Sequence, residues 1–522
     1  MELKNTPQIT RLSRILPVIG LVLIIGIFFW DIGNILAPRQ GTESLYVQIS
    51  KEMFEASSWL QPLYRGEAHW SKPPLQYWIP MPIYGLFGGF SLSIARISMG
   101  ILSLGCLFGL INFFKRQHIK IDYLPLIMIF LSSMGILKFS RIFMMEIPLT
   151  IFPFLGALYF YQYMAEKKLF DLFLASILIG LGALVKGPVS LAMGFGSLGI
   201  FYVCEIFLKN KIKISHFILV SVLSTFVASI WYLLCYQKYG EEFINYFFLR
   251  ENMGKFGKEK MSSLKIIQGL LIYLIPWLHL IPNTLTKIKN EFGRNKLIRY
   301  FFIHFVVFFG IWFIPSQKSH HYAMPGFIFF LALMILLNIR EKTSNISKTL
   351  FAIQLIIFNC VGIMSFYFAQ TMGELFISLI VLGLLAASVV KIKYRHFYYG
   401  MGFMMTFIIL PNRFYLPLVP SGEIERYLEN TTANIFYNDR RPFFLEERLN
   451  RKIFVFNADK LKKGDLVLTP VEKIQNLNSI HTAKLFSWDK WKRKVSNQEL
   501  WSAIQNRDLQ VLKSKYELHQ VK

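Results

Sequence analysis

Two glutamates of this sequence stand in or beside apolar runs, where an isolated charge is costly. Glu146 lies inside the run RIFMMEIPLTIF, and Glu43 opens a helix-like segment soon after the first apolar run. A carboxylate within an apolar membrane segment marks a candidate functional site, because its desolvation needs a compensating role. Two structural roles stay open: Glu146 in an ion pair with Arg141, and Glu43 as the first-turn charge of a helix that Thr42 caps.

Three lysines stand where glycine or proline shapes the backbone. Lys72 precedes two prolines in HWSKPPLQYW, Lys186 lies in ALVKGPVS, and Lys318 lies in SQKSHHYAMP. Such lysines are suited to contact a phosphate group, and the alternative is a lysine whose stem follows the membrane surface. The histidine pair after Lys318 favours a phosphate or sugar contact over a metal. Further candidates for contacts with the same ligand are Arg96, His321 and Tyr322.

Together these residue types indicate group transfer from a phosphate-bearing lipid. Cations hold a leaving phosphate and stabilise the negative charge that grows on it. A carboxylate accepts the proton of an attacking hydroxyl group. These roles require the side chains to meet at one end of a bundle of membrane helices.

The composition predicts such a bundle. The chain has 522 residues, of which 54% are hydrophobic and 16% aromatic, and its net charge is +26. The apolar content predicts a polytopic α-helical membrane protein over 1–410 and a soluble α/β domain over 411–522. The basic charge is either an ordinary loop surface or a match for anionic lipid or phosphate; scattered over short loops, it excludes nucleic acid as the partner. The four cysteines form no disulfide or zinc pattern.

About thirteen apolar runs are long enough to suggest membrane spans. The first is read as a retained helix rather than a signal peptide. The expected spans are 15–30, 92–114, 123–139, 143–164, 169–186, 188–208, 215–236, 266–286, 300–315, 322–339, 349–369, 373–391 and 397–411.

Basic clusters in alternate loops set the expected orientation. With this count, every cluster falls on the side of the N-terminus, which the positive-inside rule makes cytoplasmic. The loop 31–91, the turn at 316–321 and the tail are then on the outer face. The clusters lie at 115–120, 167–168, 209–213, 287–299, 340–348 and 391–395.

The outer loop 31–91 is too long for a simple connector, and long ordered loops are usually functional. Apolar residues at helical spacing predict an interfacial amphipathic helix over 43–56, and a second is expected over 75–87. In the tail, β-like runs stand at 435–437, 453–456 and 466–468, with helical patterns between and after them.

These segments resemble the polyprenyl-phosphate-sugar-dependent GT-C glycosyltransferases, in particular the lipid A aminoarabinose transferases and, more distantly, the protein O-mannosyltransferases. The similarity is distributed over residues 15 to 330, and the order of the motifs is more specific than any one of them. The matching positions are Glu43 and Tyr46; Lys72, Pro73, Pro74, Tyr77 and Trp78; Glu146 and Pro148; Lys186, Gly187 and Pro188; and Ser316, Lys318, Tyr322 and Pro325.

The resemblance implies an inverting glycosyltransferase of a bacterial inner membrane, with the N-terminus cytoplasmic and the tail periplasmic. The sugar would pass from a polyprenyl phosphate carrier to a hydroxyl or phosphate of a lipid A-like, glycan or protein acceptor. Glu43 is the expected base, and Glu146 organises the site, with a divalent cation left open and no other cofactor expected. The expected carrier contacts are Tyr46, Lys72, Arg96, Lys186, Lys318, His321 and Tyr322.

The sequence also departs from the family pattern. Thr42 stands where the family has an aspartate, Leu45 where it has an arginine, and Ser71 where an acidic residue is common. Two alternatives follow. One is a catalytically altered relative that binds lipid-linked sugars, and the other is a lipid-linked sugar transporter, for which broken helices and repeated halves are typical.

Overall fold

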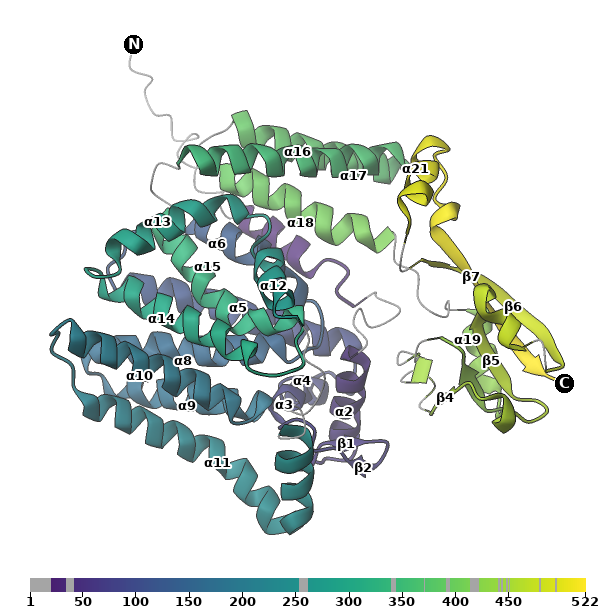
Figure 1. Cartoon of the computed structure of the whole chain (residues 1–522), viewed down its shortest axis with the longest axis horizontal. Helices are drawn as coiled ribbons and strands as arrows, with labels where there is room; N and C mark the ends of the chain where they lie inside the picture. The colour runs from purple at the N-terminus through teal and green to yellow at the C-terminus, as the bar shows by residue number, and fades with distance from the viewer. Residues whose placement is uncertain are drawn as a thin grey trace.

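Long apolar segments form the larger part of the molecule, a bundle of helices, and the C-terminal residues form a separate sheet (Figure 1). The computed structural model describes residues 20–33, 42–252, 262–338, 344–369, 371–390, 395–413, 422–439 and most of 442–522, with short gaps near 443–450, 478–479 and 493–494. Residues 1–19, which include the start of the first expected span, lie outside the described residues.

The helices of the bundle follow the apolar runs of the sequence. They are Gly20–Phe29, α5 (Leu92–Arg116), α6 (Tyr123–Ser132), α7 (Met134–Phe139), α8 (Glu146–Glu166), α9 (Leu169–Lys186), α10 (Val189–Phe207), α11 (Ile214–Ile244), α12 (Leu264–Leu274), α13 (Ile281–Glu291), α14 (Lys296–Gly310), α15 (Met324–Asn338), α16 (Asn345–Tyr367), α17 (Met372–Val390) and α18 (Arg395–Arg413).

Short helical turns join several of these helices. They are η3 (Leu278–Leu280), η4 (Ile311–Phe313) and η5 (His320–Ala323), and the π-helix η1 (Asn245–Asn252) continues α11.

The expected membrane class is confirmed, whereas the count of about thirteen spans is not. Within the described residues, eight helices are long and apolar enough to cross a membrane, or nine if the pair α12 and α13 is one span bent by 101°. The bend follows from Pro276, because the residue before a proline avoids helical dihedrals, and Ile275 is extended with ψ at 136°. The run expected at 123–139 is likewise split, at Ser133, into α6 and α7.

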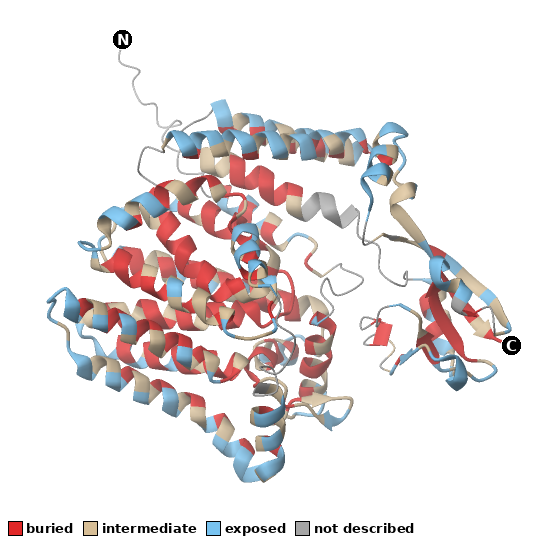
Figure 2. Ribbon diagram, viewed as in Figure 1, coloured by how far each residue is buried: buried red, intermediate tan, exposed pale blue. Residues whose placement is uncertain are grey.

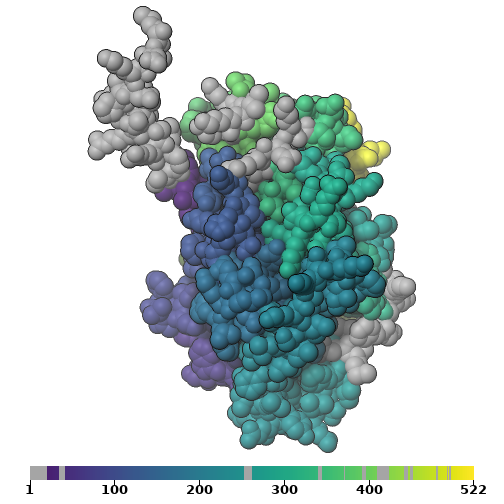
Figure 3. Space-filling view, turned by 90° about the vertical axis from the view of Figure 1, so that its left-hand side faces the viewer, coloured from purple at the N-terminus to yellow at the C-terminus, as the bar shows by residue number. Residues whose placement is uncertain are grey.

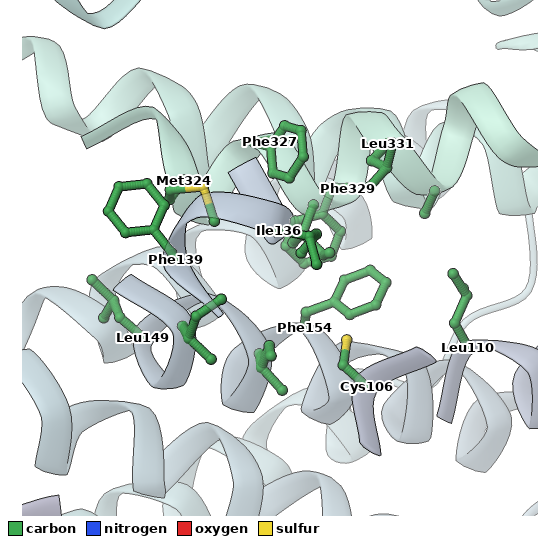
Figure 4. Packing of buried hydrophobic residues seen from close by; sticks show 14 of the residues in the cluster. Cys106, Leu110, Ile136, Phe139, Leu149, Phe154, Met324, Phe327, Phe329 and Leu331 are labelled. Atoms are coloured by element: carbon green, nitrogen blue, oxygen red, sulfur yellow. The ribbon is translucent and has the colours of Figure 1, made fainter. Parts of the chain in front are cut away.

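The interior of the bundle is packed with aromatic and aliphatic side chains (Figures 2 and 4). Phe154 of α8 meets Phe329 of α15 edge to face, with ring centroids 5.0 Å apart. A Cβ on Gly135 would lie 2.8 Å from the Phe327 ring, so α7 approaches α15 closely only because this residue has no side chain. This packing fixes the N-terminal end of α8, where Glu146 lies.

The expected outer loop folds into a cap of short elements over one end of the bundle. The helix predicted over 43–56 is present as α2 (Glu43–Glu55), and its buried face includes Ile49 and Met53, while Ala56 is exposed. The remaining elements of the cap are β1 (Leu63–Tyr64), β2 (Glu67–Ala68), α3 (Leu75–Trp78) and α4 (Met81–Leu86).

The C-terminal residues form a five-stranded mixed sheet in the order β4-β3-β5-β7-β6, in which β4, β3 and β5 are parallel. The three predicted strands are confirmed. A helix is present after them, at 497–505, but the sequence did not predict β6 and β7, which pair antiparallel along nine positions. The elements are α19 (Glu423–Asn430), β3 (Ile435–Tyr437), β4 (Phe454–Val455), η7 (Ala458–Lys460), β5 (Leu466–Pro470), η8 (Val471–Leu477), β6 (Thr482–Trp491), α21 (Asn497–Gln505), η9 (Gln510–Leu512) and β7 (Lys513–Val521).

Candidate active site

Glu146 is a buried carboxylate that accepts no hydrogen bond from any other described residue. It begins α8, and its side chain is 2% exposed. His321 Nε2 lies 3.7 Å from Glu146 Oε1. The expected alternative with Arg141 is not observed, because Arg141 donates to the carbonyls of Phe28 and Trp30. A buried carboxylate without hydrogen bonds from other residues is the feature expected of a group kept ready for a ligand.

Lys186 ends α9 on the same side of the bundle as Glu146. Its ammonium group lies 4.3 Å from the centroid of the Trp312 ring and 4.5 Å from that of Tyr322. The two rings direct the cation, because aromatic faces attract ammonium groups. Gly187 has φ at +88°, a conformation that suits glycine, and it lets α10 begin two residues later.

A set of charged and aromatic side chains surrounds Glu146. The ammonium groups of Lys186 and Lys138 act on its carboxylate. The structure therefore brings together groups that are distant in the sequence. We call this set, with Glu146 itself, the Glu146 cluster: Tyr46, Lys138, Glu146, Lys186, Tyr273, His321 and Tyr322.

Glu43 and Arg96 form a closed ion pair, which the sequence did not predict. Arg96 Nε and Nη2 donate to the two Glu43 oxygens over 2.8 and 2.9 Å, and both side chains are fully buried. The backbone N–H of Phe143 also donates to Glu43 over 2.8 Å. A carboxylate held in this way is a poor general base, and an arginine so engaged is not placed to bind a carrier phosphate.

Two predicted cations lie apart from these contacts. Lys318 is 3% exposed, and its ammonium donates to the carbonyl of Pro315 within the same turn over 2.8 Å. Lys72 is half-buried and donates to the carbonyl of Ser71 over 2.7 Å. It lies near His69, whose pKa is lowered by burial and by the charge of Lys72.

Sequence reasoning missed Lys138, Tyr273 and Trp312. Lys138 had a signal, because it interrupts the apolar run GILKFS. Tyr273 and Trp312 had none, because aromatic residues are common throughout the apolar runs and only packing selects the two that reach the Glu146 cluster.

An apolar groove lies between the cap, the end of α9 and α11. It has a volume of about 470 Å³ and is lined by Trp59, Leu60, Trp78, Leu184, Val227, Ile230, Trp231 and Leu234. Leu184 belongs to the last turn of α9, the helix that ends at Lys186, so the groove reaches the same end of that helix. An apolar chain with a charged head is a ligand of matching chemistry.

The described residues supply few ligands for a metal ion. No group of three or more His, Cys, Asp or Glu side chains gathers at one place in the described part of the chain. Glu146 and His321 offer two donors. The divalent cation that the sequence left open would therefore need further ligands from water or substrate.

Three kinds of comparison relate the chain to known proteins. A family model described as dolichyl-phosphate-mannose-protein mannosyltransferase matches residues 21–243. An uncharacterized protein of Aquifex aeolicus (strain VF5) is 27% identical over 316 residues, which are 59% of this chain and 60% of that protein. An undecaprenyl phosphate-alpha-4-amino-4-deoxy-L-arabinose arabinosyl transferase of Wigglesworthia glossinidia brevipalpis is 25% identical over 335 residues, 62% of this chain and 58% of that protein. The chain thus spans less than two thirds of the length of these relatives.

The fold is also that of a solved structure. The crystal structure of ArnT from Cupriavidus metallidurans bound to undecaprenyl phosphate superposes with a TM-score of 0.71 at 14% identity, over 96% of this chain and 98% of that one. The same protein in the apo state gives a TM-score of 0.72. The chain therefore has the ArnT-like GT-C fold and resembles the lipid A aminoarabinose transferases and protein mannosyltransferases.

Proposed function

We propose that this protein transfers a sugar from a polyprenyl phosphate carrier to an acceptor at the outer face of a bacterial inner membrane. The observation that carries this proposal is the buried carboxylate of Glu146, which accepts no hydrogen bond from any other described residue and lies near His321 and the Lys186 cation. The relatives named as arabinosyl transferases and the solved complex with undecaprenyl phosphate support the same donor class.

The proposed reaction uses Glu146 as the base in place of Glu43. The acceptor hydroxyl gives its proton to the Glu146 carboxylate, and its oxygen attacks the anomeric carbon of the sugar. The bond between that carbon and the carrier phosphate oxygen breaks, and its electron pair stays on the phosphate. Lys186 stabilises the released phosphate, because a cation in a desolvated site favours the growing negative charge. Inversion at the anomeric carbon follows from this single displacement.

The remaining groups have supporting roles in the proposal. The apolar groove at the end of α9 receives the first isoprenoid units of the carrier, so that the phosphate reaches the cation. Tyr46, Tyr322 and His321 contact the sugar or phosphate, and Lys72 meets the acceptor side from the cap.

The test is transfer of radiolabelled sugar from undecaprenyl phosphate donors to a total membrane extract by the purified full-length protein. We expect label in a lipid or glycan fraction, and a loss of about 10²–10⁴-fold in Glu146→Gln. Glu146→Asp is the matched control, because it keeps the charge and shortens the side chain. Full transfer by a folded Glu146→Gln variant would remove Glu146 from the mechanism.

A second candidate function is carrier binding without transfer. It is favoured by Thr42, which stands at the family's aspartate position and donates to the sulfur of Met144 over 3.4 Å, and by the closed Glu43–Arg96 pair. Saturable binding of undecaprenyl phosphate without transfer from any donor would support this candidate over the enzyme.

A further inference from the structure

A basic cavity lies at the end of the bundle opposite Lys186. It has a volume of about 540 Å³ and opens between the turns that follow α8 and α10 and the start of α14. The turns after α10 and α13 lie at the left edge of Figure 1, so this end of the bundle faces the viewer in Figure 3. We call it the lysine cavity, and its charged and titratable lining consists of Lys167, Lys209, Lys211, Lys213, His216 and Lys296.

The acidic residues of the neighbouring helices are committed elsewhere. Glu166 and Asp171 accept hydrogen bonds from Arg116. Glu205 accepts from Arg299 Nε over 2.6 Å and from the Asn210 amide over 3.1 Å. No carboxylate is among the described residues that line the lysine cavity. The cavity therefore gathers positive charge that an anion would neutralise.

The lysines are close enough to affect one another. Burial and the ammonium groups of Lys213 and Lys296 lower the pKa of Lys167. Lys167 and Lys209 also have positive φ, at 59° and 57°, where glycine is the usual residue at a helix end. Both turns thus carry long cationic side chains at positions where the backbone disfavours them, and both side chains line the same cavity.

The rim of the cavity is apolar and faces outward from the bundle. Met164, Ile206, Ile212 and the polar Asn210 complete the lining, and the adjacent Phe207 and Leu208 are 81% and 42% exposed. The length of α9 is about 27 Å at 1.5 Å per residue, close to the thickness of a bilayer core. The cavity therefore lies about one membrane thickness from Lys186, at the opposite interface, where a lipid headgroup meets its acyl chains.

We propose that the lysine cavity binds the phosphate headgroup of an anionic phospholipid, with the acyl chains along the exposed apolar residues beside it. This site is separate from the Glu146 cluster, and the proposal does not depend on the proposed transfer reaction. A soluble phosphate shares the headgroup chemistry, but it gains nothing from the apolar rim.

Native mass spectrometry of the full-length protein in detergent tests the proposal, with dioleoylphosphatidylglycerol, dioleoylphosphatidylcholine and inorganic phosphate as separate probes. The variant is Lys211→Gln with Lys213→Gln. The matched control is Lys289→Gln with Lys348→Gln, which removes the same charge from two exposed lysines outside the cavity. We expect the phosphatidylglycerol Kd to rise at least about tenfold in the cavity variant, because each lysine near an anionic headgroup contributes a several-fold factor.

Binding of phosphatidylglycerol to the two variants distinguishes the lysine cavity from other basic surfaces. Selective binding of phosphatidylglycerol that is weakened in the cavity variant and kept in the control supports the proposal. Equal weakening in both variants, or no weakening in the cavity variant, overturns the site. Inorganic phosphate that displaces phosphatidylglycerol at equal concentration overturns the choice of a lipid as the ligand. Thermal unfolding of the lipid-free variants checks that each remains folded.

Discussion

Glu43 and Glu146 are both buried carboxylates at the capped end of the bundle, yet their surroundings differ completely. Glu43 receives two hydrogen bonds from Arg96 and one from the backbone of Phe143. Glu146 receives none from any other described residue and has His321 at 3.7 Å. Burial of a charge is tolerated for structure when the charge is satisfied, whereas an unsatisfied charge persists where a ligand or a reaction uses it.

Removal of Arg96, the partner of Glu43, is expected to have the largest effect on stability. Arg96→Met leaves the Glu43 carboxylate buried and uncompensated, so we expect a loss of about 3–5 kcal/mol in the free energy of unfolding. Denaturant unfolding of the purified protein in detergent measures the loss. The double variant Glu43→Gln, Arg96→Met should recover most of it, because no unpaired charge remains. An Arg96→Met protein as stable as wild type would show that the pair has no structural role.

A gain in stability, rather than a loss, is expected when the Glu146 carboxylate is removed. Glu146→Met replaces an unsatisfied buried charge by an apolar side chain of similar length, so we expect stability to rise by about 1–3 kcal/mol. Sugar transfer should be lost in the same protein. Glu43→Met is the matched comparison and should lower stability. A destabilised Glu146→Met variant would contradict the view that Glu146 is kept for function at a cost in stability.

Replacement of Lys186, the cation near Glu146, is expected to have a smaller effect, on the affinity for the carrier. Lys186→Met removes the ammonium group between Trp312 and Tyr322, and we expect affinity for undecaprenyl phosphate to fall about tenfold, the typical contribution of one charge-assisted contact. Lys186→Arg should retain most of the affinity because it keeps the charge. Equilibrium binding of labelled carrier measures both. Equal affinity of the methionine variant would show that the phosphate lies elsewhere.

Asp439 of the C-terminal sheet is a third carboxylate, and its partners are partly exposed. Its contribution to stability should therefore be the smallest of the three. Burial alone raises the pKa of Asp439, but hydrogen bonds from Lys473 over 2.8 Å and Tyr516 over 2.7 Å hold that pKa below its ordinary value. The unfolded chain then binds the proton more tightly, so the stabilisation is present above pH of about 4 and is lost as pH falls through the folded pKa.

Hydrogen exchange of the sheet amides in wild type and Asp439→Asn checks this sign. We expect the wild type to be better protected at pH 7, and its advantage over the variant to shrink as pH falls toward about 3. An advantage that stays constant over this range would show that the Asp439 charge does not stabilise the sheet.

The local pattern of apolar and polar residues was sufficient to predict many of the helices and strands. The helix expected over 43–56 is present as Glu43–Glu55, and the strand expected over 435–437 has the same bounds. It was insufficient for β6 and β7, whose lysines, Glu517 and Gln520 are good helix formers. These segments become strands because each pairs with the other and β7 also pairs with β5, and such pairing overrides local preference.

Local sequence patterns likewise identified some residues of the candidate site and not others. A charge inside an apolar run is a local signal, and it identified Glu146. The ion pair of Glu43 was not predicted, because its partner, Arg96, lies 53 positions away and nothing local reveals a bidentate pair. Lys186 was found from its glycine and proline, while the two rings that hold it come from two other elements.

The membrane class, most helix positions and the residue types available for chemistry can be read from the sequence, because hydrophobic periodicity and isolated charges are local properties. Which buried carboxylate is satisfied depends on the folded arrangement. Hydrogen-bond partners come from distant segments, and packing fixes their distances to a few tenths of an ångström. The difference between a structural ion pair and a group available for reaction lies within those distances.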